Sequence, residues 1–279
     1  QVSFDSGGLQ LRGMLHLPAE VKGSPFVFCP PFAEEKKCSY RVMVHAAWRL
    51  AELGRAVLRF DLTGTADSEG DPAEGAPSRW RRDIEAAIGF AKEQTDSAKV
   101  SLLGLRLGSS LAAQVTAHRD DVDELVLWEP IVNGPTYLSH NLRRSLIKRA
   151  LTEGEGFDAT TGTQREAGDG HVDFDGHLVG ARCQEEIKEI DLLSRPAPRA
   201  ERVLIVNITP RPSLTKACQQ LHDQYREAGC EVEAVPVREQ PFWNLIGLVT
   251  GQASIEATVE WLGQPSPALR APSPTGRGM

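Results

Sequence analysis

The sequence predicts an α/β domain in which a mostly parallel sheet is covered by helices on both faces. Two observations lead to this fold class. Short apolar runs alternate with amphipathic stretches up to about residue 130 and again after about residue 181. Hydrophobic residues make up 41% of the 279 residues, which is enough for a sizeable core. Strands that alternate with helices form βαβ units, and these units build parallel sheets with two covered faces.

The individual elements follow from the period of the apolar residues. Short apolar runs predict strands at residues 9–17, 25–29, 56–60, 100–103, 125–128, 202–207 and 231–237. Apolar residues at helical spacing predict helices at residues 39–53, 79–94, 107–117, 182–193, 214–228 and 254–262. In the first helix, Val42, Ala46, Leu50 and Leu53 share one face, and Gly54 ends it.

The alternation is interrupted between about residues 133 and 180. Residues 152–176 are rich in Gly, Thr, Asp and Glu, which suits either a loose insertion or a disordered loop. We expect one α/β domain over residues 1–263, with residues 133–180 as a cap-like insertion. Residues 264–279 are rich in Pro and Gly, so we expect a disordered tail there.

Composition excludes several classes of protein. The formal net charge of −7 argues against a general nucleic-acid binder. No apolar run approaches the ~20 residues of a membrane-spanning helix, and no signal-peptide pattern is present. The five scattered cysteines form no CxxC pair and no zinc-binding spacing. We therefore expect a cytoplasmic protein with reduced thiols, no metal and no cofactor, and the oligomeric state stays open.

The most informative motif is Gly104-Leu105-Arg106-Leu107-Gly108, between an expected strand and an expected helix. Its G-x-X-x-G spacing is that of the nucleophile elbow of α/β-hydrolases. The two glycines keep the turn tight, and the central side chain is directed above the carboxyl ends of the strands. In a working hydrolase the central residue is Ser, Cys or Asp. Arg106 cannot be a nucleophile because its guanidinium stays protonated.

Two further turns agree with this fold. The turn from Asp61 to Ser68, which contains Gly64, resembles the D-x-x-G-x-G-x-S turn of α/β-hydrolases, where Asp61 would brace the loop. Cys29-Pro30-Pro31-Phe32 follows a strand at the position of the oxyanion loop. The backbone N–H groups of Phe32 and Leu107 are therefore the candidate oxyanion donors. Together the three motifs predict an α/β-hydrolase fold.

The remaining triad positions lack the usual residues. The loop at 207–211 has no carboxylate, and the loop at 238–243 has no histidine. Glu129 follows the strand at 125–128 and is a candidate acid, or alternatively a partner for Arg106 or for a backbone N–H. Within the insertion, His140, His171 and His177 could approach the site, although such histidines are more often exposed loop residues.

The sequence resembles a group of α/β-hydrolases associated with exosortase A systems, the second type, found beside bacterial exopolysaccharide loci. Five segments carry this resemblance, at residues 30–35, 61–70, 104–108, 128–134 and 241–243. The arginine at the elbow and the Phe242-Trp243 pair near the usual histidine position are similar to this group's own pattern. The resemblance implies a role in exopolysaccharide or envelope-protein processing, while the group's name as a hydrolase reflects its fold.

An arginine at the elbow favours an anion. Arg106 offers a bidentate donor fork beside the positive end of the following helix, which suits a carboxylate, phosphate or sulfate. We expect Phe242, Trp243 and Trp128 to form an apolar wall. The ligand would be an acidic glycan or the phosphopantetheine arm of an acyl carrier protein. In the alternative, Arg106 pairs with Glu129 or Glu34 and fills the pocket.

Three functions remain open. The leading hypothesis is an α/β-hydrolase-like protein without an ordinary Ser-His-Asp triad that binds or processes an anionic or acyl substrate. The second is an active esterase or thioesterase with a displaced nucleophile, for which Cys29 is the candidate. The third is a pseudoenzyme that acts as a non-catalytic scaffold or partner. Glu34, Glu35 and Asp67 are candidate acid/base groups, or more commonly a solvated charged surface.

Overall fold

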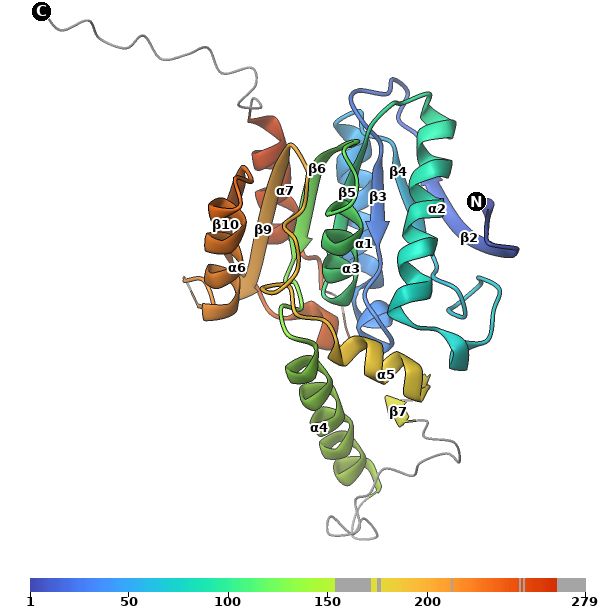
Figure 1. The fold of residues 1–279 in the computed structure, drawn as a ribbon, viewed down its shortest axis with the longest axis vertical. Helices are drawn as coiled ribbons and strands as arrows, with labels where there is room; N and C mark the ends of the chain where they lie inside the picture. Colours follow the sequence, from blue (N-terminus) through green and yellow to red (C-terminus); the bar gives the residue numbers. More distant parts are fainter. Residues whose placement is uncertain (154–171, 175–176, 212, 246, 248, 265–279) are drawn as a thin grey trace, which may run out of the picture.

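The computed structural model describes residues 1–153, 172–174, 177–211, 213–245, 247 and 249–264 (Figure 1). Its centre is an eight-stranded sheet with the strand order β1-β2-β4-β3-β5-β6-β9-β10. β1 and β2 run antiparallel to their neighbours, and the pairs from β4 to β10 are parallel. The strands are β1 (Val2–Ser6), β2 (Leu9–His16), β3 (Phe26–Cys29), β4 (Val57–Phe60), β5 (Val100–Leu105), β6 (Val122–Trp128), β9 (Arg202–Thr209) and β10 (Val232–Arg238).

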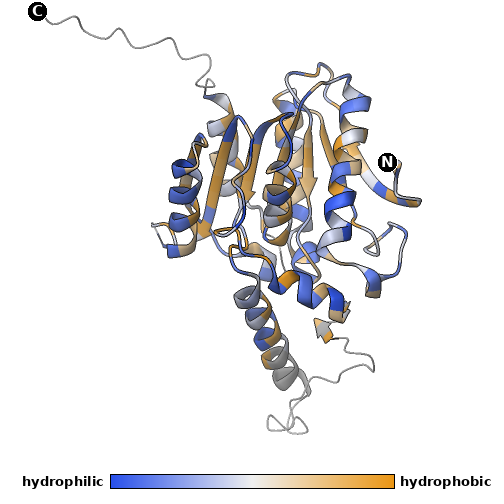
Figure 2. Cartoon of the chain, in the orientation of Figure 1, coloured by the Kyte–Doolittle hydropathy of each residue, from blue (hydrophilic) through white to orange (hydrophobic). Residues whose placement is uncertain are grey.

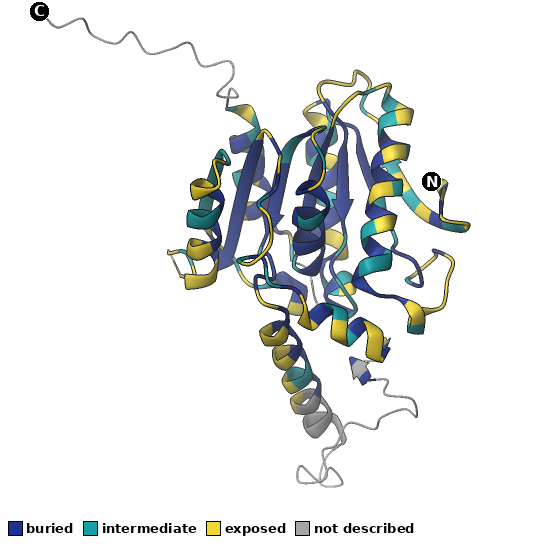
Figure 3. Ribbon diagram, in the orientation of Figure 1, coloured by how far each residue is buried: buried dark blue, intermediate teal, exposed yellow. Residues whose placement is uncertain are grey.

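Helices cover both faces of this sheet. One face carries α2 (Pro77–Thr95), α3 (Leu107–Thr116) and α6 (Lys216–Glu227), and the other carries α1 (Glu34–Glu52) and α7 (Gln252–Gly263). The apolar side chains of the strands alternate between two cores. Val27 and Leu102 face the core of α2 and α3, whereas Phe26 and Leu103 face the core of α1. The central strands are therefore mostly apolar and mostly buried (Figures 2 and 3).

The segment between β6 and β9 lies beyond the carboxyl ends of the strands (Figure 1). It contains α4 (Gly134–Glu153), the hairpin of β7 (Val172–Phe174) and β8 (His177–Val179), and α5 (Ala181–Lys188). The cap-like role of this segment stays a prediction. Residues 152–176 and 264–279 were expected to be loose or disordered. Most of them, including 154–171 and 265–279, lie outside the described residues.

The predicted strands and helices are present, with differences in some bounds and with additional elements that include the β7–β8 hairpin. β1 and α4 were not expected, and α1 begins at Glu34 rather than at residue 39 because its first turn is charged and carries no apolar signal. α4 does have a start signal. The Asn133 side chain accepts the Thr136 N–H at 3.0 Å, and Pro135 follows near the helix start, which is a common N-terminal arrangement. α5 ends at Lys188, before the predicted residue 193.

Two further features complete the fold. β10 forms one edge of the sheet, and its exposed Pro236 lies opposite Asn207 of β9. In the part of the chain that the structure describes, no helix is long and apolar enough to cross a membrane.

Candidate functional site

Arg106 occupies the tight turn between β5 and α3. Its backbone has φ 56° and ψ −120°, a conformation that non-glycine residues rarely adopt. A Cβ atom on Gly108 would lie 2.2 Å from the Cys29 carbonyl oxygen, and one on Gly104 would lie 2.5 Å from the Ser109 backbone. Both flanking positions therefore require glycine, and the turn directs the Arg106 side chain out of the sheet.

The Arg106 guanidinium forms an ion pair with Glu35 of α1. Its Nε donates to Glu35 Oε1 at 3.1 Å, and the Tyr137 hydroxyl of α4 donates to Glu35 Oε2 at 3.1 Å. The Glu35 side chain is 2% exposed and that of Arg106 is 17% exposed. Burial is the largest influence and acts to lower the pKa of Arg106, but Glu35, Tyr137 and Glu129 together outweigh it, so this pKa is raised. Burial and the charge of Glu35 raise the pKa of Tyr137, so its phenol stays a donor.

Two aromatic rings flank the Arg106 guanidinium. Its central carbon lies 4.9 Å from the Trp243 ring centroid and 5.4 Å from that of Tyr137. Cation–π contacts of this kind orient a guanidinium. In the described residues, neither terminal nitrogen of Arg106 has a hydrogen-bond acceptor. Arg106 is thus fixed through Nε while its donor fork has no protein partner there.

The expected pairing of Arg106 with Glu129 or Glu34 is wrong. Glu34 instead lies 3.6 Å from the Lys37 ammonium and 3.9 Å from Nε2 of His177, a histidine of the insertion. Glu34 and Glu35 are consecutive on a helix, so their side chains diverge, and only one can reach the elbow.

Glu129 follows β6, and its side chain accepts hydrogen bonds from the end of the neighbouring strand β9. Its Oε2 accepts Asn207 Nδ2 at 2.8 Å and the Ile208 N–H at 2.7 Å, and its own backbone has φ 45°. Burial raises the pKa of Glu129, although these two hydrogen bonds oppose the shift. Among the described residues, no histidine contacts it. The loop after β10 places Phe242 and Trp243 at the usual histidine position.

Comparisons with known proteins agree with this architecture. A family model described as serine aminopeptidase, S33 (Hydrolase_4), matches residues 37–155. Est1E from Butyrivibrio proteoclasticus with bound ferulic acid is 19% identical, with a TM-score of 0.67 over 94% of this chain and 98% of that one. The Pyrococcus furiosus esterase PF2001 is 14% identical, with a TM-score of 0.64 over 94% and 88% of the two chains. The chain has the α/β-hydrolase fold.

A third similar structure is proline iminopeptidase from Mycobacterium smegmatis. It is 14% identical, with a TM-score of 0.62 over 94% of this chain and 97% of that one. No curated protein matches the sequence. At these identities the similarity shows the α/β-hydrolase fold, whereas activity depends on the residues of the site.

The expected aromatic wall is only partly present. Trp128 and Phe242 are fully buried in the core, with ring centroids 6.3 Å apart, and Trp128 Nε1 donates to Thr258 Oγ1 at 2.9 Å. The Arg106 N–H donates to the Trp128 carbonyl at 2.9 Å, but among the described residues neither the Trp128 ring nor the Phe242 ring lies over the guanidinium, so their assignment to a pocket wall is corrected. Trp243 alone of the three reaches the guanidinium.

Cys29 does not fit the role of a displaced nucleophile. It is the last residue of β3 and is fully buried in the core between the sheet and α2. Burial raises the pKa of the Cys29 thiol far above its usual range. Since the thiolate is the nucleophile, this thiol is unreactive where it lies.

The two backbone positions of the expected oxyanion hole lie on segments that touch. A Cβ on Gly108 would also lie 2.5 Å from the Pro30 carbonyl oxygen, so the loop after β3 runs directly beside the elbow. The Phe32 ring packs 5.1 Å from the Trp80 ring, centroid to centroid. The N–H groups of Phe32 and Leu107 stay predictions as oxyanion donors.

The Asp61 side chain pairs with α1, and its role in bracing the turn after β4 stays a prediction; the turn also has partners that sequence reasoning missed. Lys36 Nζ lies 2.6 Å from Asp61 Oδ1, and Gly64 has φ 72° with no room for a side chain beside Asp71. The buried Asp83 of α2 accepts the Thr63 N–H at 2.8 Å. In sequence, Asp83 is one polar residue of an amphipathic helix, and nothing distinguishes it.

Little empty space surrounds the Glu35 carboxylate. A cavity of about 10 Å³ lies between Glu35, Tyr137 and Phe174, which is room for about one water. The described residues include no group of three or more His, Cys, Asp or Glu side chains that could hold a metal ion.

Proposed function

We propose that this α/β-hydrolase-like protein binds an anionic ligand at Arg106 and has a degenerate catalytic triad. The observation that carries the proposal is the state of the guanidinium. Its Nε is held by Glu35, while its terminal nitrogens have no acceptor within the described residues. A fork with two free donors matches a carboxylate, phosphate or sulfate in a bidentate arrangement.

The surroundings of Arg106 favour the same ligand class. α3 begins at the next residue, Leu107, and the amino end of a helix attracts negative charge. Trp243 and Tyr137 flank the guanidinium and limit its rotamers. Holding a donor group in place before binding lowers the entropy that the ligand must offset.

The degenerate triad rests on the residues at its three positions. The elbow carries Arg106, residues 207–211 at the end of β9 and just after it include no carboxylate, and the loop after β10 lacks a histidine. Glu129 is held by amide donors, and no base lies on it among the described residues. An ordinary acyl transfer needs a nucleophile and a base in contact.

The ligand class can be narrowed by the resemblance to the exosortase-associated group. It supports an acidic glycan or the phosphopantetheine arm of an acyl carrier protein, and a role in exopolysaccharide or envelope biogenesis in the cytoplasm. Both ligands carry the anionic group that Arg106 would receive.

A second candidate function is a non-catalytic partner protein in which the ion pair fills the site. The burial of Glu35, its second hydrogen bond from Tyr137 and the cavity of only about 10 Å³ favour it. In this case Arg106 stabilises the fold and no small ligand enters.

Calorimetric titration with D-glucuronate and with inorganic phosphate tests the proposal. We expect saturable binding of at least one of them to the wild type, lost at least ~10-fold in Arg106→Leu, since a charged hydrogen bond contributes about 1.5–3 kcal/mol. Arg182→Leu is the matched control, because Arg182 is an exposed arginine of α5 with an ion pair to Glu186. Arg106→Lys, which keeps the charge without the fork, should bind with intermediate affinity.

A hydrolysis panel separates the alternatives. We expect no turnover of aryl esters or acyl thioesters by the wild type. Turnover that disappears in Cys29→Ala would establish the displaced nucleophile and overturn the proposal. Absence of both binding and turnover, in protein whose circular dichroism is native, would support the partner protein instead.

A further inference from the structure

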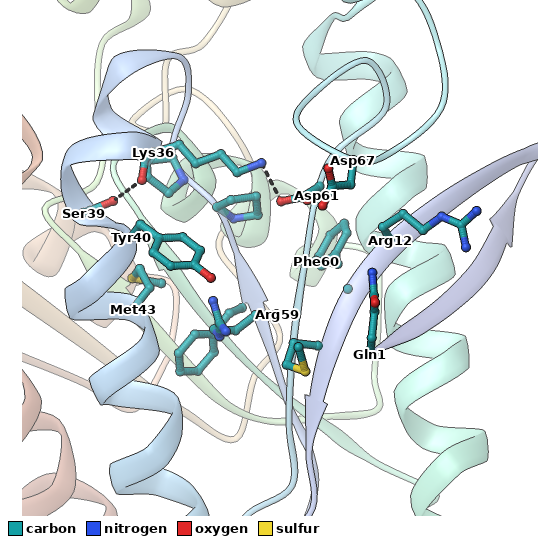
Figure 4. Close-up of a pocket in the computed structure, with 15 residues that line it drawn as sticks. Gln1, Arg12, Lys36, Ser39, Tyr40, Met43, Arg59, Phe60, Asp61 and Asp67 are labelled. Carbon is teal, nitrogen blue, oxygen red and sulfur yellow. Dashed lines mark hydrogen bonds and ion pairs between the residues drawn. The ribbon is translucent and has the colours of Figure 1, made fainter.

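A second and larger cavity lies beside α1, lined by residues that neighbour Glu35 on the helix surface. Its volume is about 150 Å³, and it opens between α1 and strands β2, β3 and β4 (Figure 4). Phe28, Met14 and Met43 supply apolar walls. An apolar protein cavity of similar volume can hold a benzene molecule. The space therefore suits one six-membered ring or a short alkyl chain.

Arg59 of β4 brings a positive charge to this apolar space. Its Nε donates to His16 Nε2 at 3.2 Å, and its guanidinium carbon lies 5.4 Å from the Tyr40 ring centroid. Burial and the charge of Arg59 lower the pKa of His16, so the imidazole is neutral and can accept this bond. Within the described part of the chain, the terminal nitrogens of Arg59 have no acceptor.

The α-amino group of Gln1 lines the cavity too and adds positive charge near His16, the partner of Arg59. Lys36 and Asp61 neutralise each other at 2.6 Å, and Figure 4 shows this pair and Asp67 in the upper part of the view, with Arg59 below them. Arg12 and Asp67 are exposed at the rim. The end formed by Arg59, Tyr40 and Met43 is thus both apolar and positively charged.

We propose that this cavity binds a small monocarboxylate with an apolar body, such as an arene carboxylate or a short-chain fatty acid. The carboxylate accepts hydrogen bonds from the terminal nitrogens of Arg59, and the body packs against Met14, Met43 and Phe28. A neutral ring would leave the guanidinium unpaired, and a bare inorganic anion would leave the apolar walls empty.

The cavity is distinct from the site at Arg106. Glu35 faces Arg106 and Tyr137, whereas Lys36, Tyr40 and Met43 of the same helix line this cavity. The inference therefore stands whether or not Arg106 binds an anion.

Methionine methyl signals offer a direct test. The chain has three methionines, and two of them, Met14 and Met43, line the cavity, so a spectrum of protein labelled with ¹³C at the methionine methyl groups is simple to assign. We expect benzoate to shift both signals saturably, with a Kd between ~10 μM and ~10 mM for so small a ligand. Benzamide, its neutral analogue, should bind at least tenfold more weakly.

Variants assign the carboxylate to Arg59. Arg59→Leu should weaken benzoate binding roughly 10- to 100-fold, and Arg59→Lys should weaken it less because the charge remains. Arg41→Leu, at an exposed position of α1 outside the cavity, should leave binding unchanged. Arg106→Leu should leave the shifts of Met14 and Met43 unchanged.

Three outcomes would overturn the proposal. The first is the absence of a saturable shift at ~10 mM benzoate. The second is equal binding of benzoate to the wild type and to folded Arg59→Leu or Arg59→Lys, or equal affinities for benzoate and benzamide. The third is loss of binding in Arg106→Leu alone, which would assign the carboxylate to the elbow.

Discussion

The two ends of the sheet use buried arginines differently. At the amino ends of the strands, Arg55 donates from Nε to the Ser24 carbonyl at 2.9 Å and from Nη2 to Glu124 at 2.8 Å and Ser101 at 3.0 Å. Arg202 adds a second guanidinium on Glu124 at 3.3 Å. At the carboxyl ends, Arg106 donates from Nε alone.

Exposure does not explain this difference, because the Arg55 side chain is 13% exposed and that of Arg106 is 17% exposed. Removing a guanidinium from water is costly unless its donors are satisfied. Arg55, whose donors have protein acceptors, therefore fastens loops and strands together. The terminal nitrogens of Arg106 have no acceptor among the described residues, so they are available to a ligand. Four predictions test this division.

The largest effect is expected at the amino ends. Glu124→Leu removes the carboxylate shared by Arg55 and Arg202, so the free energy of unfolding should fall by about 3–5 kcal/mol. Urea denaturation measures it. Glu201→Leu is the control, because Glu201 pairs with Lys99 on the surface and should contribute under ~1 kcal/mol. Equal losses in both variants would contradict the role given to Glu124.

A smaller effect is expected at the elbow. Arg106→Leu leaves the buried Glu35 without its ion pair, and stability should fall by about 1–3 kcal/mol. The double variant Arg106→Leu, Glu35→Leu should recover part of this loss, with a coupling energy of about 0.5–3 kcal/mol in a double-mutant cycle. Additive losses would mean that the pair does not couple the elbow turn to α1.

The pH dependence should have opposite signs for two glutamates on β6 and just after it. Burial acts to raise the pKa of Glu124, but Arg55, Ser101 and Arg202 outweigh it and lower this pKa. Its contribution is therefore present above the unfolded value of about 4.3 and is lost as pH falls through the lower folded pKa.

For Glu129 the sign is reversed, because burial raises its pKa. Its contribution is full below about pH 4.3 and is lost as pH rises through the raised folded pKa. Urea titrations from acidic to neutral pH, with Glu124→Gln and Glu129→Gln against the wild type, should give difference slopes of opposite sign. Slopes of the same sign would refute the contrast between the two carboxyl groups.

The smallest loss of stability is expected at an exposed ion pair, which serves as the reference for the buried pairs. Lys188 and Glu185 form a surface pair at 2.6 Å, with side chains 49% and 68% exposed. Lys188→Ala should change the free energy of unfolding by less than ~1 kcal/mol and the Tm by only a few degrees. A larger loss would show that exposed pairs in this protein matter as much as the buried ones.

Sequence reasoning predicted the backbone better than the partners of its side chains. The tight turn at Gly104 and Gly108 could be predicted from the sequence. Neighbouring backbone leaves no room for a Cβ atom at either position, so both must be glycine, and the spacing between them is recognisable. The sequence could not predict that Arg106 pairs with Glu35 and not with Glu34. Two adjacent glutamates on a helix differ only in the direction in which their side chains point.

Two other residues show why the rest of the site was not predicted. Tyr137 lies on a helix whose polar and apolar residues have no clear period, and its contact with Glu35 spans 102 residues of sequence. Trp128 ends a strand next to the site, yet its indole points into the opposite core and donates to Thr258. The position of a residue at the end of a strand therefore does not show which face of the sheet its side chain packs against.

The edge strand β10 bears on self-association. An edge strand offers unpaired backbone groups to another chain, and proline removes one donor from that row. Pro236 is exposed in β10, and Glu233 and Arg238 add charges on either side of it. Strand-to-strand joining of two copies along the β10 edge is therefore disfavoured, so any assembly this protein forms should use another surface.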